Sequence, residues 1–465
     1  MKMADGVEIF SSAEKGRGLC ATKVFKPGNL VRAAEPYAYV LCNSERGKRC
    51  DFCFARKDDM SRCSGCKFAR YCDGKCQKAA WTEHKSECKS IKTVKPETPT
   101  DSIRLIARII NKTKTDGPGV PGNSIDELQS NLREMPENVK EMFAQLAVVL
   151  RMYVGRDVMD DAREIFELFG RMTCNTFSIC DSEMQYIGIG IYPKMSLFNH
   201  SCAPNCVAVF NGLRMEVRAI QTIQPGEELL ISYVEMLALS KVRKQQLLQQ
   251  YYFTCRCPSC QDQTKDGMMM AVKCGNINCK KVIIQVDGAY ETCKECGHDN
   301  EKDPAFFKEV NKVTQFSEEM LEAVTSADQR QEPKEGLRLA ERLLERQQKV
   351  LHNNHLFVLK CLDKALDQAV VLRKWNRALR CALQTIEPYK VHFPAYHPSL
   401  GIQYMRIGKL LLYLEKRLAA LEALQMAEHI LNVTHGKDHP INKELGDLLT
   451  QCMDEMRMYQ AQKKK

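Results

Sequence analysis

The chain of 465 residues has no long hydrophobic run. Its longest apolar stretches, such as residues 146–150, have the length of core segments, whereas a membrane-spanning helix needs about 18 to 20 apolar residues. Residues 1–10 also lack the apolar block of a secretory signal peptide. We therefore expect a protein that neither crosses a membrane nor is secreted, and its length allows about three or four domains.

Cysteine, by contrast, is abundant: there are 23, and 15 of them fall in clusters with the short spacings of metal ligands. Without an export signal, such clusters indicate thiolates that bind zinc in a reducing compartment rather than disulfides, so the expected location is the cytoplasm and the nucleus. Residues 50–88 hold enough ligands for two tetrahedral sites: Cys50, Cys53, Cys63, Cys66, Cys72, Cys76, His84 and Cys88.

The net charge of +10 is concentrated around this first cluster, where residues 45–97 carry 14 Lys and Arg against 8 Asp and Glu. Such a surface could contact the phosphates of nucleic acid. It could equally be a solvated surface around two metal sites, and this second interpretation is favoured. A weak DNA contact is kept as the alternative.

Two further cysteine sets lie downstream. The first combines Cys202, which follows Asn199-His200-Ser201, with Cys255, Cys257 and Cys260. The second has the spacing of a small zinc ribbon and consists of Cys274, Cys279, Cys293 and Cys296. The alternative for this second set is a reduced loop that holds no metal.

Hydrophobic periodicity changes along the chain. Residues 7–42, the region near 174, and residues 207–210, 215–219 and 229–233 alternate as strands do. Residues 101–170 carry apolar positions at helical spacing: Ile103, Ile106, Ala107 and Ile110, then Met142, Leu146, Val149 and Leu150. From about residue 303 onward the pattern is helical. The His-Pro pair of Tyr396-His397-Pro398 occurs again in Asp438-His439-Pro440, 42 residues later. This period predicts stacked helix–turn–helix repeats.

Together these motifs resemble those of the SET- and MYND-domain family of protein-lysine methyltransferases. The first cluster is similar to a MYND zinc finger, and four pieces match the SET domain that the finger splits: Lys15-Gly16-Arg17-Gly18-Leu19, Cys174-Asn175 with Phe177, Asn199-His200-Ser201-Cys202, and Gly226-Glu227-Glu228-Leu229 with Ser232-Tyr233. They stand in the family's order before a cysteine-rich post-SET tail, so the resemblance covers nearly the whole chain. The set at 274–296 departs from the family's best-known vertebrate members.

The resemblance implies an α+β fold with a split, β-rich SET core and a C-terminal all-α domain of tetratricopeptide-like repeats. The expected parts are the N-terminal part of SET (1–49), the MYND finger (50–88), a helical insert (89–172), the SET core (173–240), the cysteine-rich post-SET region (241–300) and the helical repeats (301–465).

In that family the ligands of the finger interleave. One zinc ion would be bound by Cys50, Cys53, Cys72 and Cys76, and the second by Cys63, Cys66, His84 and Cys88. A third would be bound by Cys202, Cys255, Cys257 and Cys260 and would fasten the post-SET segment over the lysine channel. The ribbon at Cys274, Cys279, Cys293 and Cys296 would add a fourth.

The resemblance also implies S-adenosyl-L-methionine as the methyl donor. Its pocket would be lined by Lys15, Gly16, Arg17, Asn131, Asn175, Asn199 and His200, with Phe253 over it. The hydroxyl of Tyr233 would lie beside the transferred methyl group. Phe177 and Tyr233 would wall the channel for the substrate lysine, because aromatic faces tolerate a cation and exclude water. A tyrosine in a strand-like stretch is otherwise usually part of a core.

The resulting hypothesis is a protein-lysine N-methyltransferase, expected to be a monomer, that acts on histone tails, non-histone proteins or both and regulates transcription. The alternative is a catalytically weak scaffold whose finger and helical repeats recruit transcription or chaperone partners. Such partners would present proline-rich segments or an acidic chaperone tail. The candidates for attracting an acidic tail are Lys360, Lys364, Arg373 and Lys374.

Overall fold

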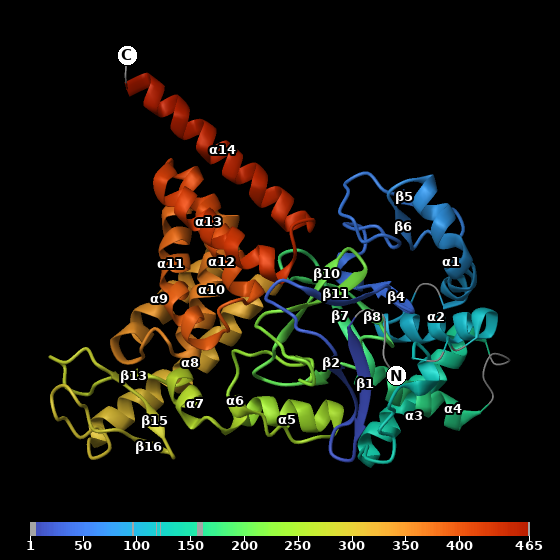
Figure 1. Ribbon diagram of the computed structural model, residues 1–465, viewed down its shortest axis with the longest axis horizontal. Helices are drawn as coiled ribbons and strands as arrows, with labels where there is room; N and C mark the ends of the chain where they lie inside the picture. The colour runs from blue at the N-terminus through green and yellow to red at the C-terminus, as the bar shows by residue number, and fades with distance from the viewer. Residues whose placement is uncertain (1–5, 95–96, 118, 121, 156–160, 464–465) are drawn as a thin grey trace. The chain divides into compact units, whose positions relative to one another are not determined.

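The computed structural model describes residues 6–94, 97–117, 119–120, 122–155 and 161–463, and Figure 1 shows their secondary structure. The chain divides into two compact units. The first comprises Met1–His200, Pro204–Ile231 and Gln246–Thr254, and the second comprises Ser201–Ala203, Ser232–Gln245 and Cys255–Lys465. Among the described helices, none combines the length and the apolar character that a bilayer span requires.

Small antiparallel sheets form the β-structure of the first unit, as the alternating segments predicted. Strands β1 (Val7–Ser12) and β2 (Gly16–Ala21) make a hairpin. One three-stranded sheet has the order β10 (Cys206–Asn211), β11 (Arg214–Ala219), β3 (Leu30–Ala34). The other has the order β4 (Ala38–Leu41), β8 (Tyr186–Ile191), β7 (Thr176–Cys180).

A short parallel pair joins two of the quoted motifs. Strand β9 (Asn199–His200) pairs with β12 (Leu230–Ile231), so that Leu230 lies opposite Asn199 and Ile231 opposite His200. The residues before and after these strands are therefore held side by side although thirty positions separate them.

The first cysteine cluster lies in loops, beside the strand pair β5 (Ser61–Arg62) and β6 (Arg70–Tyr71), and on helix α1 (Gly74–Val94), which carries Cys76 near its start and His84 and Cys88 further along. Helix α1 continues past residue 88, so the expected boundary between the finger and the insert falls inside a helix. The insert continues with α2 (Asp101–Asp116), α3 (Glu137–Val154) and α4 (Ala162–Asn175).

Helix α2 buries all four of the positions that its periodicity predicted. Helix α3 is confirmed as a helix, but its apolar stripe is only partly buried: Leu150 is buried and Leu146 half-buried. Met142 and Val149 are 48% and 47% exposed, whereas Phe143, Ala147 and Leu150 are buried. The reason is Phe143, whose ring stacks on that of Phe169 in α4 at 5.2 Å. An aromatic ring buries more apolar area than methionine or valine and sets the inner face.

The second unit begins with short elements around the downstream cysteines. These are α5 (Ser240–Tyr251), which ends in the first unit, then α6 (Pro258–Gln261), α7 (Gln263–Met269), the pair β13 (Val272–Lys273) and β14 (Val282–Ile283), and the pair β15 (Gln285–Val286) and β16 (Ala289–Tyr290).

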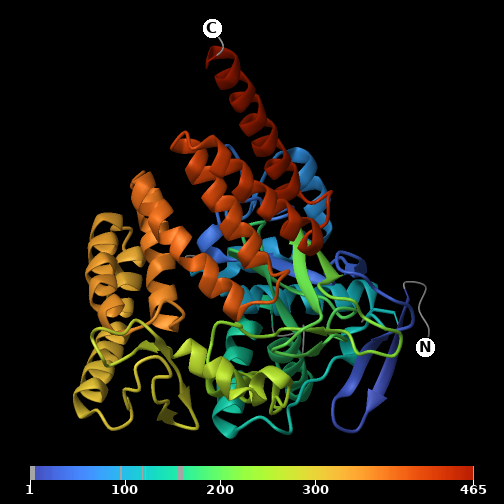
Figure 2. The same cartoon turned by 60° about the vertical axis from the view of Figure 1, so that its left-hand side comes forward.

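Long helices then fill the rest of this unit and stack one against the next (Figure 2). They are α8 (Pro304–Gln329), α9 (Pro333–Val350), α10 (Leu356–Val371), α11 (Trp375–His392), α12 (Pro398–Tyr413), α13 (Arg417–Thr434) and α14 (Pro440–Lys463).

A histidine begins every second helix of this stack, and the three histidines lie 42 residues apart. The Nδ1 atom of His397 accepts a hydrogen bond from the N–H of Ser399 at 3.2 Å, and that of His439 accepts one from Ile441 at 3.2 Å. His355 does the same with Phe357 at 3.1 Å. The predicted repeat therefore has a third member, which the sequence concealed because Leu356 stands where the other two copies have proline.

Candidate active site and metal centres

Pieces of three quoted motifs meet at the side chain of Glu228. One carboxylate oxygen lies 2.5 Å from Nζ of Lys15, and the other accepts a hydrogen bond from Nδ2 of Asn199 at 2.9 Å. The backbone carbonyl of Glu228 accepts a further bond from Nδ2 of Asn205 at 2.8 Å. Two predicted cofactor residues, Lys15 and Asn199, are thus brought together by a glutamate of the motif Gly226-Glu227-Glu228-Leu229 that was not among the predicted site residues.

Gly18 allows this arrangement because it has no side chain. A Cβ atom at position 18 would lie 2.6 Å from Nδ2 of Asn199 and 2.6 Å from the ring of Phe10, closer than real contacts allow. Gly16 is needed for a different reason: its φ of +66° at the β1–β2 turn is a conformation that glycine adopts at little cost.

Arg17 leads from this point to the remaining predicted asparagines. Its guanidinium donates to the carbonyl of Glu127 and lies 3.6 Å from that residue's carboxylate. Two residues further on, the carbonyl of Gln129 accepts a bond from Nδ2 of Asn175 at 2.9 Å. The segment 127–131 therefore links Arg17 to the end of α4.

Asn131 lies at the same place. Its Nδ2 is 3.4 Å from Sγ of Cys174, the residue before Asn175. Its φ of +48° is a left-handed conformation that asparagine tolerates better than most residues. Gly170 of α4 lets this loop approach, since a Cβ there would lie 2.6 Å from the carbonyl oxygen of Ser130.

The ring-bearing side chains predicted for the site lie in two separate groups. The ring centroids of His200 and Phe253 lie 6.0 Å apart, so the structure brings these two together. Phe177 on β7 packs edge-on against Tyr192 at 5.8 Å. Tyr233 follows β12 and is half-buried. Phe177 belongs to the first unit and Tyr233 to the second, and the channel between them stays a prediction.

Four groups of metal-ligand side chains are present, and in each the ligand atoms all lie within 4.8 Å of one another. Their membership agrees with the predicted sets: Cys50, Cys53, Cys72 and Cys76; Cys63, Cys66, His84 and Cys88; Cys202, Cys255, Cys257 and Cys260; Cys274, Cys279, Cys293 and Cys296. All 23 cysteines lie in the described part of the chain, and none of them forms a disulfide.

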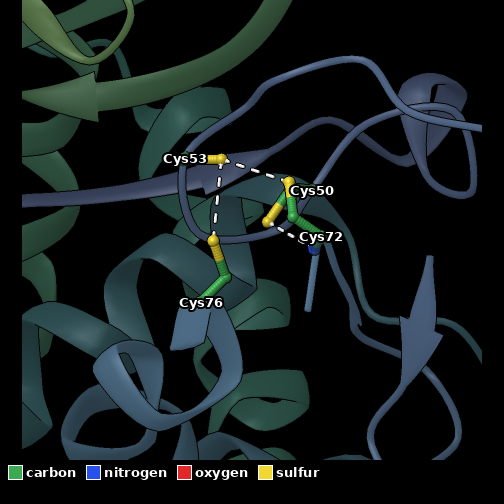
Figure 3. Close-up of side chains that lie close together, drawn as sticks. All are labelled: Cys50, Cys53, Cys72 and Cys76. Atoms are coloured by element: carbon green, nitrogen blue, oxygen red, sulfur yellow. Dashed lines mark hydrogen bonds between the residues drawn. The ribbon is translucent and has the colours of Figure 1, made fainter. Parts of the chain in front are cut away.

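The spacing of the thiols fits zinc. A tetrahedral site with Zn–S bonds of about 2.3 Å has S–S edges of roughly 3.8 Å. The Sγ atom of Cys53 lies 3.6 Å from that of Cys72 and 4.0 Å from that of Cys76. Figure 3 shows these thiols gathering with Cys50 from loops and a helix start. A set of four protein ligands leaves no open position, so each metal would be structural rather than catalytic.

The second site is fixed by a buried carboxylate. His84 lies with Nε2 3.5 Å from Sγ of Cys66 and with Nδ1 3.2 Å from Glu87. Glu87 also accepts bonds from Arg104 at 2.9 Å and Arg108 at 2.7 Å, both on α2. Burial alone would raise the pKa of Glu87, but the two guanidinium groups, Arg108 first, hold it well below its usual range. A histidine bonded in this way presents Nε2 to a metal.

At the third site a buried cation offsets the charge of the thiolates. The Sγ atoms of Cys202 and Cys260 are 3.5 Å apart. The guanidinium of Arg243, only 1% exposed, lies 3.6 Å from Sγ of Cys260 and donates to the carbonyl of Ser259 at 3.2 Å. Four thiolates around Zn²⁺ carry a net charge of about −2, which a neighbouring arginine stabilises.

The fourth set has the same geometry: Cys274 and Cys296 are 3.7 Å apart, as are Cys279 and Cys293. Gly297 turns the chain after the last cysteine with a φ of +69°. The nearby His298 is not part of the set, because its Nε2 lies 3.1 Å from the carboxylate of Asp303. The convergence of four thiols favours a metal site over the alternative of a loop without one.

Comparison with known proteins bears on both the site and the fold. The SET domain family matches residues 16–234. The chain is 36% identical over 453 residues to "Histone-lysine N-methyltransferase SMYD3" of Mus musculus, an alignment that covers 96% of this chain and 97% of the relative. It is 32% identical over 455 residues to "N-lysine methyltransferase SMYD2-A" of Xenopus laevis, covering 96% of this chain and 100% of the relative.

Proposed function

Because the chain belongs to the family of SET- and MYND-domain protein-lysine methyltransferases, we propose that it transfers a methyl group from S-adenosyl-L-methionine to lysine side chains of proteins. The observation that carries this proposal is the bonding around Glu228, which joins Lys15 and Asn199 across more than 180 residues of sequence. A scaffold would have no use for this arrangement.

The side chains present suit the chemistry of that cofactor. Lys15 and Arg17 offer cations for a carboxylate, and three asparagine amides offer donors and acceptors for polar groups. The rings of His200 and Phe253 offer a flat apolar surface. Asn131 and Asn175 would share the pocket with Asn199, since Arg17 and the segment 127–131 connect them.

When bound, the cofactor supplies an activated methyl group on a positively charged sulfur. The lysine must then arrive neutral, in line and away from water. Tyr233 would accept a hydrogen bond from the lysine amine and orient its lone pair. Phe177 would form the opposite wall of the channel and keep water out.

The proposal includes zinc in all four clusters, in structural roles. It also names protein substrates, with histone tails and non-histone proteins as the two classes, because the relatives are named as histone-lysine and N-lysine methyltransferases. Action on histones would make the protein a regulator of transcription. Zinc-bound thiolates need reducing surroundings, so we place its activity in the cytoplasm and the nucleus.

Methyl transfer from radiolabelled cofactor to a lysine peptide array tests this function. Tyr233→Phe removes only the hydroxyl, and we expect at least about tenfold slower transfer, or roughly 1.4 kcal/mol of barrier. Binding of S-adenosylhomocysteine, measured by calorimetry, should stay near wild type. His200→Ala should impair both binding and rate.

Tyr413→Phe is the matched control, because that tyrosine is 66% exposed and lies on α12 in the helical stack. Wild-type turnover in Tyr233→Phe would remove this residue from the mechanism. A wild-type protein that neither binds S-adenosylhomocysteine nor labels any peptide would instead favour the scaffold.

A further inference from the structure

The helical stack contains a groove with a volume of about 730 Å³ between α8 and α10. Its charged lining residues are Glu318 and Glu322 from α8, and Lys360, Asp363, Lys364 and Asp367 from α10. Leu321 and Phe357, both half-buried, add an apolar strip. Stacked helical repeats commonly use such a concave surface to bind extended segments of other proteins.

Two of the charged groups in the groove already have partners. Nζ of Lys364 lies 3.1 Å from Asp328 of α8, and the carboxylate of Asp367 lies 3.3 Å from Arg406 of α12. Glu318 and Glu322 are exposed and form no ion pair with any residue that the structure describes. Lys360 is also exposed and can offset one of these carboxylates, so the lining still offers more carboxylates than its own cations neutralise.

Asp363 is a further carboxyl group of the lining, in a half-buried position. The hydroxyl of Tyr389 donates to it at 2.8 Å, but among the described residues no cation comes within ion-pair distance. Burial, together with the neighbouring Asp367, raises the pKa of Asp363 to about 7. A cation placed in the groove would relieve this cost by favouring the charged carboxylate.

We propose that the groove between α8 and α10 binds an extended, basic segment of a partner protein. Arginine or lysine side chains would pair with Glu318, Glu322 and Asp363, and their aliphatic stems would lie along Leu321 and Phe357. A lining with more carboxylates than lysines would repel an acidic tail. The groove thus selects its partner by charge, whether or not that partner is methylated.

The test uses the full chain and a short fluorescent peptide of alternating arginine and serine, which contains no lysine to be methylated. Fluorescence anisotropy should show binding that weakens with added salt. An otherwise identical peptide with glutamate in place of arginine should not bind. The double substitution Glu318→Gln and Glu322→Gln should weaken binding of the basic peptide by about fivefold, since two partly exposed charge pairs are lost.

Glu422→Gln with Glu428→Gln is the matched control. It removes the same charge from exposed positions on α13, outside the groove, and should leave binding unchanged. Glu318→Lys with Glu322→Lys should reverse the preference and favour the acidic peptide. The proposal is overturned if wild-type protein prefers the acidic peptide, or if the groove and control variants bind the basic peptide equally. Methyl transfer by the same preparations, measured separately, reports on the active site and not on the groove.

Discussion

At the scale of single residues, two glutamates organise the predicted ligands. Glu228 holds Lys15 and Asn199, and Glu87 holds the zinc-ligand candidate His84. Motif spacing predicted the ligands but neither glutamate, because a spacing reports which residue types are present and not which side chains orient them. Glu87 had a local signal, since a residue three positions after His84 on one helix shares its face. Glu228 contacts Lys15 across 213 positions, and no pattern in the neighbouring sequence indicates such a contact.

Substituting Glu87 should show how strongly this network stabilises the finger. Glu87→Gln keeps the size of the side chain but removes the carboxylate that Arg108 pairs with, and leaves the buried Arg104 only Asp51, at 3.3 Å. We expect the free energy of unfolding of the first unit to fall by about 3–5 kcal/mol, the usual cost of breaking a buried charge pair. Denaturant unfolding measures this, and a chromogenic chelator should withdraw zinc faster from the variant.

Glu83→Gln is the control for that experiment. Glu83 lies on the same helix and pairs with Lys112 at 3.0 Å, but its side chain is 36% exposed. The loss there should stay below about 1 kcal/mol. If the two substitutions prove equally mild, the buried network is not what holds the finger against α2.

At the scale of elements, periodicity located the strands and helices but not how they pair. The alternating segments near 207–210 and 215–219 became β10 and β11, yet the pairing of β11 with β3 joins residues almost 190 positions apart. Helix α3 shows the second limit. Its apolar residues occur on more than one face, and contact with Phe169 decides which face is buried. Such choices depend on neighbours that a single sequence does not reveal.

The histidine caps make the helical stack sensitive to acid. Burial lowers the pKa of His355 to about 4 and that of His397 to about 3. Between pH 6.5 and those values the unfolded chain binds protons that the folded chain does not. The full free energy of unfolding is therefore present above about pH 6.5. Below that pH it falls by about 1.4 kcal/mol per pH unit for each histidine, until the pKa of the folded state is reached.

A variant with both His355→Asn and His397→Asn should keep the caps, because asparagine is a good helix N-cap, and lose this titration. We expect its urea midpoint, followed by circular dichroism, to depend less on pH between 6.5 and 4.5 than that of the wild type. His429→Asn, at an exposed position of α13, should leave the wild-type slope unchanged. Equal slopes in the double variant and the wild type would contradict the role of the caps.

At the scale of the whole molecule, the net charge of +10 says little about local surfaces. The sequence suggested that Lys360, Lys364, Arg373 and Lys374 lie on a concave face that attracts acidic tails. The first two do line a groove, but carboxylates outnumber lysines there. Arg373 and Lys374 belong to the turn between α10 and α11, where Arg373 has a φ of +54°. Helix ends and rotations decide which charges meet, and composition does not contain that information.

The grouping of the metal-ligand side chains is the property of the whole chain that was predicted most completely. Short spacings located most of the ligands, and the resemblance to the family assigned them to sets, including Cys202, which lies 53 residues before Cys255. We expect four zinc ions per chain by elemental analysis. Cys279→Ser should lower the value to three and destabilise the helical stack, since Cys274 and Cys293 belong to the same hydrophobic core as α8, α9 and α10. Binding of S-adenosylhomocysteine should not change.

Cys381→Ser, on α11 outside every cluster, is the control and should retain four zinc ions. A wild-type value of three that Cys279→Ser leaves unaltered would show that the fourth set of thiols holds no metal, and that packing alone keeps it together.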